Sequence, residues 1–210
     1  RATRLDALDL RAVHLRADGT DLHVGLPADA VWVAADMDSP SERRFCANLP
    51  TEEVFTSPAP ARVEGVFRCS RALALDGRFI EGIEAELRGG RLVRIGASTA
   101  SDTAFLQSYF AQDAGAGRLG ELALVDRSSR IGQTGRAYGM TLLDENAAAH
   151  VALGSGFVSA RRPAAGARRS AVNVSRTHVD VMIGTDDMDV DGTDARGATV
   201  PLIRDGGWVV

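Results

Sequence analysis

The sequence Val13-His-Leu-Arg-Ala-Asp-Gly-Thr-Asp-Leu-His-Val-Gly25 contains two short extended runs on either side of Asp18-Gly19-Thr20. Asp-Gly between two such runs is a strong signal for a β-hairpin. We therefore predict strands at residues 13–17 and 21–25, and a third strand at residues 31–35.

Three further extended runs follow between residues 62 and 95, separated by Asp76-Gly77 and Gly89-Gly90. Dipeptides that contain glycine in this way mark turns. Residues 63–69, 80–87 and 92–95 are therefore predicted to be strands of a β-meander. Most of this half of the chain is therefore expected to be β structure.

The second half of the chain mixes helices with strands. Apolar residues fall on one helical stripe between residues 103 and 112, and Ser101 or Asp102 is placed to cap that helix. Residues 122–125, 179–183 and 200–203 are predicted strands, the last two being linked by an acidic, glycine-containing turn region.

A second helix is predicted to begin at Asp144 and to end at Gly154, so that His150 lies on it in an Ala-rich run. The elements show none of the βαβ rhythm of a parallel sheet. We expect an α+β fold with a mixed, largely antiparallel sheet and a few helices, forming one catalytic-type domain over residues 1–210.

Composition excludes several classes of function. All 24 basic residues are arginine, which excludes a P-loop lysine, a Schiff-base lysine and a lysine general base. The formal net charge of −4, with no cluster of basic and aromatic residues, argues against nucleic acid as a partner. The absence of a long apolar run or a signal peptide, with only Cys46 and Cys69 as thiols, predicts a cytoplasmic protein that does not bind membranes.

Two motifs, one rich in glycine and one rich in aspartate, are weak indications of a dinucleotide-binding site and a calcium site. Gly115, Gly117 and Gly120 spell GxGxxG, but the expected order is helix, glycines, strand, the reverse of a dinucleotide-binding motif. The segment from Asp187 to Gly192 resembles the start of a calcium loop, yet Ala198 stands where a bidentate Glu is required, so an acidic hairpin is the better interpretation.

Two histidine positions are candidates for metal binding. His178 and Asp180 are two residues apart in an extended segment, so both side chains project from one face of a strand. The pair can clamp a metal, or Asp180 can simply orient the histidine. His150 could reach a cation from its Ala-rich segment, although a single histidine is commonly structural.

Three glutamates are the other candidates. Glu121 stands at the beginning of a predicted hydrophobic strand. An ionised carboxylate is costly there unless it is paired or bound to a metal. The alternative is that Glu121 reaches solvent at the exposed end of the strand. Glu52 and Glu53 lie in a loop between Pro50 and Pro58, which either presents them rigidly or forms a solvated acidic turn.

The sequence resembles the carboxy-terminal half of the aminopeptidase T and aminopeptidase S family of metallopeptidases, and the matching segments occur in order along the chain. The resemblance spans nearly the whole chain and is carried by four main segments. They are Asn48-Leu-Pro-Thr-Glu-Glu-Val-Phe-Thr-Ser-Pro58, Gly117-Arg-Leu-Gly-Glu-Leu-Ala-Leu-Val125, Leu142-Leu-Asp-Glu-Asn-Ala-Ala-Ala-His-Val-Ala-Leu-Gly154 and Thr177-His-Val-Asp-Val-Met-Ile-Gly184.

The resemblance implies a site with two divalent metal ions, Zn²⁺ or Co²⁺ in the first place and Mn²⁺ or Mg²⁺ as alternatives. The ligands that it implies are Glu53, Glu121, His150, His178 and Asp180. Such a pair of ions can activate a water molecule and polarise a peptide carbonyl. A carboxylate would serve as general base, and Glu52, Glu53 and Glu121 all remain candidates.

The chain departs from the family in two ways. The family places a functional Tyr seven residues after the metal-binding His, and this chain has Phe157 there, which removes a phenol that could stabilise an oxyanion. The second expected departure is that the family's amino-terminal domain is missing, and with it we expect a homodimer or association with a separate chain that supplies that domain.

The expected function is a metal-dependent aminopeptidase that releases amino-terminal residues from peptides. Two alternatives remain open at this point. One is a metal-binding or interaction domain with impaired catalysis, and the other is a specialised amidase or peptide-tailoring hydrolase that uses the same metals.

Overall fold

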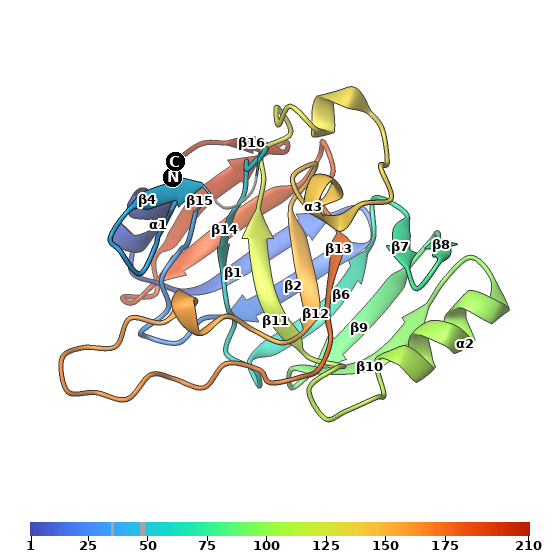
Figure 1. Cartoon of the computed structure of the whole chain (residues 1–210), viewed down its shortest axis with the longest axis horizontal. Helices are drawn as coiled ribbons and strands as arrows, with labels where there is room; N and C mark the ends of the chain where they lie inside the picture. The colour runs from blue at the N-terminus through green and yellow to red at the C-terminus, as the bar shows by residue number, and fades with distance from the viewer. Residues whose placement is uncertain (35, 47–48) are drawn as a thin grey trace.

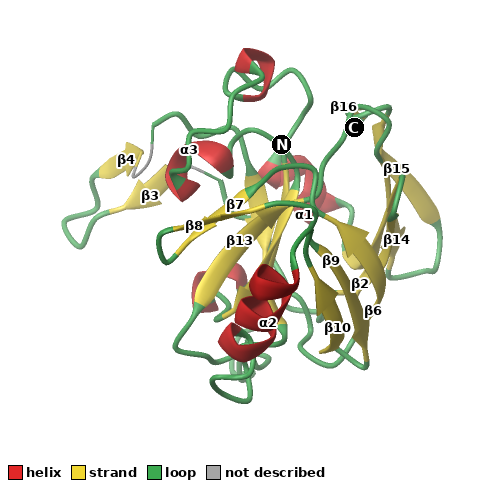
Figure 2. Ribbon diagram, turned by 90° about the vertical axis from the view of Figure 1, so that its right-hand side faces the viewer, coloured by secondary structure: helices red, strands yellow, loops and turns green. Residues whose placement is uncertain are grey.

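The computed structural model describes residues 1–34, 36–46 and 49–210, and two antiparallel sheets dominate it. Figure 1 shows the smaller sheet lying across the front of the larger one, and Figure 2 shows helix α2 (Ala100–Tyr109) at the end of the molecule nearest the viewer. The larger sheet has eight strands, in the spatial order β10 (Arg91–Gly96), β9 (Glu84–Arg88), β6 (Val63–Arg68), β2 (Thr20–Gly25), β1 (Leu10–Ala17), β14 (Asp189–Asp194), β15 (Thr199–Arg204) and β16 (Gly207–Trp208).

The predicted hairpin lies at the centre of the larger sheet. β1 and β2 pair from Ala17 and Thr20 at the turn to Ala12 and Gly25 at the open end. Gly19 supplies the positive φ of 73° that the tight turn requires. Alternate residues of both strands are buried, and the intervening ones, including His14 and His23, form the opposite face of the sheet.

The smaller sheet has the strand order β13 (His178–Met182), β12 (His150–Gly154), β11 (Leu119–Leu124) and β5 (Val54–Thr56). Apolar side chains on one face of this sheet join those of the larger sheet in a single core, which includes Leu122, Leu124, Val151, Leu153, Val179 and Val181. Because side chains alternate along a strand, the residues between these positions face the other way. That outer face carries the candidate ligands.

Helices and two short ribbons complete the fold, which confirms the predicted α+β class. The helices are α1 (Ala2–Ala7), α2, α3 (Thr141–Asp144) and the short 3₁₀ turns η1 (Gly132–Thr134) and η2 (Val158–Ala160). The ribbons are β3 (Asp36–Asp38) with β4 (Arg44–Cys46), and β7 (Leu73–Leu75) with β8 (Arg78–Ile80). Among the described residues, no helix combines the length and apolar character needed to cross a membrane.

Several predicted strands differ from those observed. Residues 31–34 form only an isolated bridge from Val33 to Phe55, and residue 35 lies outside the described part of the chain. The strand predicted at residues 80–87 is split between β8 and β9 by a turn that includes Gly82, whose φ is 63°. The predicted acidic turn region contains strand β14, which pairs antiparallel with β1 and β15, and Arg16 and Arg204 on those two strands form ion pairs with Asp191 of β14.

The two helix predictions have different outcomes. Helix α2 is present, but its cap is Thr99 instead of Ser101 or Asp102, and the Asp102 backbone N–H donates to the Thr99 side chain. The prediction of a helix from residue 144 to residue 154 is wrong: α3 ends at Asp144, and His150 opens strand β12. Pairing of β12 with a strand on each side satisfies its backbone and outweighs the helix propensity of the alanines.

Candidate metal centre

Strand register brings four of the five predicted ligands onto one face of the smaller sheet. Glu121, Ala152 and Asp180 are direct neighbours across β11, β12 and β13. His150 and His178 each lie two residues before Ala152 and Asp180, and the period of two along a strand puts their side chains on the same face.

The fifth predicted ligand, Glu53, precedes β5 at the edge of the sheet. Phe55 pairs with Ala123, which is two residues after Glu121, so Phe55 shares the face of the cluster. Glu53 is two residues before Phe55, and its Oε2 lies 3.1 Å from the Nε2 atom of His150. All five predicted ligands therefore lie together.

The donor atoms fall into two groups that share one carboxylate. Glu53, Glu121 and His150 form one group, and Glu121, His178 and Asp180 form the other, with the donor atoms of each group within 4.8 Å of one another. The Nε2 atom of His178 lies 3.2 Å from Glu121 Oε2 and 3.3 Å from Asp180 Oδ1. A carboxylate has two oxygens, so Glu121 can serve both groups at once.

Both imidazoles are oriented by backbone carbonyls. His150 Nδ1 lies 3.1 Å from the Ala148 carbonyl oxygen, and His178 Nδ1 lies 2.7 Å from the Ser155 carbonyl oxygen. A carbonyl only accepts, so each Nδ1 carries a proton and donates it. The Nε2 atoms face the carboxylates, which is the arrangement of metal-binding histidines whose other ring nitrogen donates a hydrogen bond to a carbonyl.

Burial and charge shift the pKa values of this cluster strongly. Burial opposes the charged form of both imidazoles, but the carboxylates outweigh it, and they raise the pKa of His150 to about 10 and that of His178 to about 11. Burial raises the pKa of Glu121, whereas hydrogen bonding from His178 overcomes burial and lowers the pKa of Asp180. Buried carboxylates are stable when they pair with cations or coordinate metal ions, and a set of carboxylate oxygens with two imidazoles fits divalent metal ions.

Glu145 is a further carboxylate at this site that the sequence analysis missed. It directly follows α3 and is half-buried, and burial together with repulsion from Glu53 and Asp180 raises its pKa to about 7. On the helix predicted for this segment, residues 145 and 150 would point about 140° apart. The strand at His150 removes that separation, so only the correct secondary structure could have indicated Glu145.

Glu52 does not join the cluster but pairs with Arg130. Its Oε1 lies 3.0 Å from Arg130 Nε and accepts a hydrogen bond of 3.1 Å from the Arg130 backbone N–H. Its own backbone N–H donates to Asn146. The Glu52 carboxylate is therefore engaged outside the two donor groups.

Phe157, where the resemblance implies a Tyr, lies beside the cluster. Its ring centroid is 5.0 Å from that of His178 in an edge-on contact, and 5.1 Å from that of Phe55. Its backbone N–H donates to Ser57 Oγ at 2.8 Å, which holds the residue in place. A side chain at this position can contact a molecule bound at the cluster.

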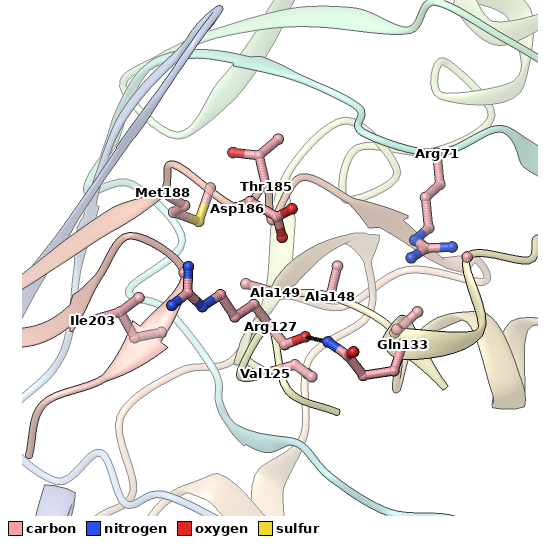
Figure 3. Close-up of a pocket in the computed structure, with 15 residues that line it drawn as sticks. Arg71, Val125, Arg127, Gln133, Ala148, Ala149, Thr185, Asp186, Met188 and Ile203 are labelled. Atoms are coloured by element: carbon pink, nitrogen blue, oxygen red, sulfur yellow. Dashed lines mark hydrogen bonds between the residues drawn. The ribbon is translucent and has the colours of Figure 1, made fainter. Parts of the chain in front are cut away.

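A pocket of about 230 Å³ lies next to the segment that leads into His150. Figure 3 shows Arg71 and Arg127 at separate places in its wall, together with Ala148, whose carbonyl orients His150. Met188 and Ile203 of the core also line it. None of the five predicted ligands belongs to the described lining, so the pocket is distinct from the cluster.

Sequence comparison identifies relatives along the whole chain. Aminopeptidase T of Thermus aquaticus is 44% identical over 202 residues, which cover 95% of this chain and 49% of the relative. Aminopeptidase PepS of Streptococcus thermophilus is 36% identical over 215 residues, covering 100% of this chain and 52% of the relative. The chain thus spans about half the length of these curated relatives and corresponds to their carboxy-terminal half.

Structural comparison agrees with the sequence. Wild-type AmpT from Thermus thermophilus matches with a TM-score of 0.93 and 42% identity, over 100% of this chain and 52% of that one. A 2,5-dihydroxypyridine dioxygenase from Pseudomonas putida KT2440 matches with a TM-score of 0.66, 16% identity and cover of 100% and 58%, a likeness of fold alone. The family model for thermophilic metalloproteases, M29, matches residues 1–208. The chain therefore belongs to the M29 family of thermophilic metalloproteases.

Proposed function

We propose that the chain is the metal-binding half of an aminopeptidase that uses two divalent metal ions to release amino-terminal residues from peptides. The observation that carries the proposal is that two three-donor groups share Glu121. The names of the relatives, aminopeptidase T and aminopeptidase PepS, support the choice of reaction. Zn²⁺ or Co²⁺ are the proposed ions, with Mn²⁺ or Mg²⁺ as alternatives, because the donors combine oxygen with imidazole nitrogen.

In this proposal each donor group would hold one ion, and Glu121, which belongs to both groups, would contribute to each. Glu53 and His150 complete one site, and His178 and Asp180 complete the other. When bound, such ions polarise the scissile carbonyl and lower the pKa of a water molecule. The protein's own contribution is to hold the imidazoles in the required tautomer through the Ala148 and Ser155 carbonyls.

Glu145 is the proposed general base. Its pKa of about 7 reflects burial and the neighbouring carboxylates, and in the described part of the chain its carboxylate makes no ion pair. Cations at the cluster would lower that pKa, so the group would be ionised and able to accept a proton near neutral pH. Glu52 is excluded from this role in the proposal, because Arg130 engages its carboxylate.

We also propose a location and an assembly for the protein. Cys46 and Cys69 are not joined in a disulfide, which supports a location in the reducing cytoplasm. For the assembly we propose a homodimer, or association with a separate chain that corresponds to the remaining half of the relatives.

The proposed reaction predicts metal-dependent turnover. Hydrolysis of leucine p-nitroanilide should appear when Co²⁺ or Zn²⁺ is added to chelator-treated protein, and renewed chelation should abolish it. The reason is that, in the proposed reaction, the bound metal ions are the Lewis acid that polarises the peptide carbonyl. Bound metal without turnover would favour an impaired metal-binding domain over an enzyme. Failure to bind either metal would overturn both.

Phe157 favours that impaired domain as a second candidate function. Its ring lies 5.0 Å from the His178 ring but offers no hydrogen-bond donor. A positioned donor is worth about 100-fold to 1,000-fold when it stabilises an oxyanion in acyl transfer. An otherwise intact metal centre with Phe157 could therefore bind metals and peptides with little turnover.

The substitution Phe157→Tyr should raise kcat by about tenfold to 100-fold without changing the bound metal, because it adds one donor beside the cluster. Rates with leucine p-nitroanilide and metal analysis of the same samples measure the two effects. Phe55→Tyr is the matched control, since the rings of Phe55 and Phe157 are neighbours at 5.1 Å. Equal gains from both substitutions, or no gain from Phe157→Tyr, would show that the missing phenol does not limit the reaction.

A further inference from the structure

A second group of metal-binding side chains lies on the central hairpin of the larger sheet. His14 on β1 is the direct cross-strand neighbour of His23 on β2, and Asp21 lies two residues before His23 on the same face. The imidazole rings of His14 and His23 stack with centroids 3.6 Å apart and planes 19° apart. This face of the hairpin is separate from the cluster on the smaller sheet.

The donor atoms of this group converge. His14 Nε2 lies 2.7 Å from Asp21 Oδ1, and His23 Nε2 lies 3.7 Å from the same oxygen. Ligands of a tetrahedral Zn²⁺ ion, at their usual bond lengths, are about 3.3 Å from one another. The observed separations lie on both sides of that value, so small side-chain movements would bring all three donors into coordination.

The surroundings leave room for an ion and a water ligand. The side chains of Asp21 and His23 are more than half exposed, at 67% and 60%, while that of His14 is 24% exposed. Three protein ligands with an open fourth position are the arrangement of solvent-accessible zinc sites. Movement of the two exposed side chains therefore meets little steric resistance.

The charges around the group are nearly balanced. Arg16 lies next to His14 and pairs with Asp191, which in turn pairs with Arg204, and Arg204 also lies 4.0 Å from Asp189, so these two positive and two negative charges cancel. The carboxylate of Asp21 therefore provides the local negative charge that would attract a cation.

Arg16 also determines what an incoming ion must displace. Its NH1 atom lies 3.1 Å from His14 Nδ1, and because a guanidinium only donates, His14 Nδ1 accepts and Nε2 carries the proton. That proton points to Asp21 at 2.7 Å. An ion at Nε2 would replace the proton, and the imidazole would then carry its proton on Nδ1, in conflict with the Arg16 donor.

We infer that His14, Asp21 and His23 form a second, solvent-accessible site for a divalent transition-metal ion, separate from the proposed catalytic centre. Two imidazoles and one carboxylate select Zn²⁺, Ni²⁺ or Cu²⁺ over Mg²⁺ or Ca²⁺, which prefer oxygen ligands. The ion ties β1 to β2 in the middle of the larger sheet.

Equilibrium dialysis against Zn²⁺, with zinc counted per chain, tests this site. Relative to wild type, His23→Gln should lose about one zinc per chain or bind it at least about tenfold more weakly. Glu64→Gln is the control, because Glu64 is the neighbour of His23 on β6 and does not belong to the donor group. Equal zinc content in His23→Gln and wild type would overturn the inference. The comparison holds whatever the smaller sheet binds, because its donors are the same in every variant.

Arg16→Gln provides a test of opposite sign. Removing the guanidinium removes both a positive charge and the donor to His14 Nδ1, so zinc should bind this site more tightly than in wild type. Circular dichroism before metal addition checks that each variant is folded. Unchanged or weaker zinc binding by folded Arg16→Gln would contradict the proposed coordination through His14 Nε2.

Discussion

Glu121→Gln should remove both metal ions and lower kcat/KM by about a thousandfold or more. Glu121 belongs to both donor groups, whereas each of the other four predicted ligands belongs to one. Lewis-acid stabilisation by bound metal is worth several kcal/mol, which corresponds to at least this loss of rate. Metal analysis after dialysis and the rate with leucine p-nitroanilide measure the two losses on one preparation.

The same substitution should leave the metal-free fold intact. Burial raises the pKa of Glu121, so its ionised form is disfavoured at this position and a neutral amide of similar shape removes that cost. Because Glu121 also helps to raise the pKa of His178, the amide gives up part of that pairing, and the melting temperature in chelator should stay close to that of wild type. Glu52→Gln is the matched control, because Glu52 pairs with Arg130 and lies outside both donor groups. If Glu121→Gln retained two ions per chain, the bridging arrangement would be wrong.

Glu145→Gln should lower kcat by about 100-fold to 10,000-fold while both ions stay bound. This range is the usual contribution of a positioned general base, and an amide of the same size cannot accept the proton. Because Glu145 is outside the two donor groups, metal content should be unchanged. Steady-state kinetics with saturating Co²⁺, combined with metal analysis, separate the two effects.

The pH profile gives a second readout for Glu145. If its carboxylate accepts the proton, the acid limb of the kcat profile should be shallower or absent in Glu145→Gln, because the group that must be ionised is gone. A purely structural role would scale the whole profile without changing its shape. Loss of one ion per chain in this variant would instead make Glu145 a ligand and contradict its assignment as the base.

Strands could be predicted where turn residues or the spacing of side chains in a short segment marked them. Asp18-Gly19 placed the central hairpin, and Gly89-Gly90 separated two strands of the larger sheet as predicted. The spacing of His178 and Asp180 also indicated a shared face on β13, which the structure has. Each of these features depends on residues close together in the chain.

Features that depend on distant partners were not predictable in this way. The alanines before His150 suit a helix, and only the flanking strands β11 and β13 explain why His150 lies in a strand. The same error concealed Glu145. The arrangement of Glu121 beside His178 follows from cross-strand register between β11, β12 and β13, which no single segment specifies; only the family resemblance grouped those residues in advance.

The sharing of Glu121 by two ions is the central claim, and anomalous diffraction from crystals soaked in Zn²⁺ tests it most directly. Data collected on both sides of the zinc absorption edge should show two peaks, one beside Glu53 and His150 and one beside His178 and Asp180, with Glu121 between them. A single peak in the smaller sheet, or none there, would contradict the two-metal account.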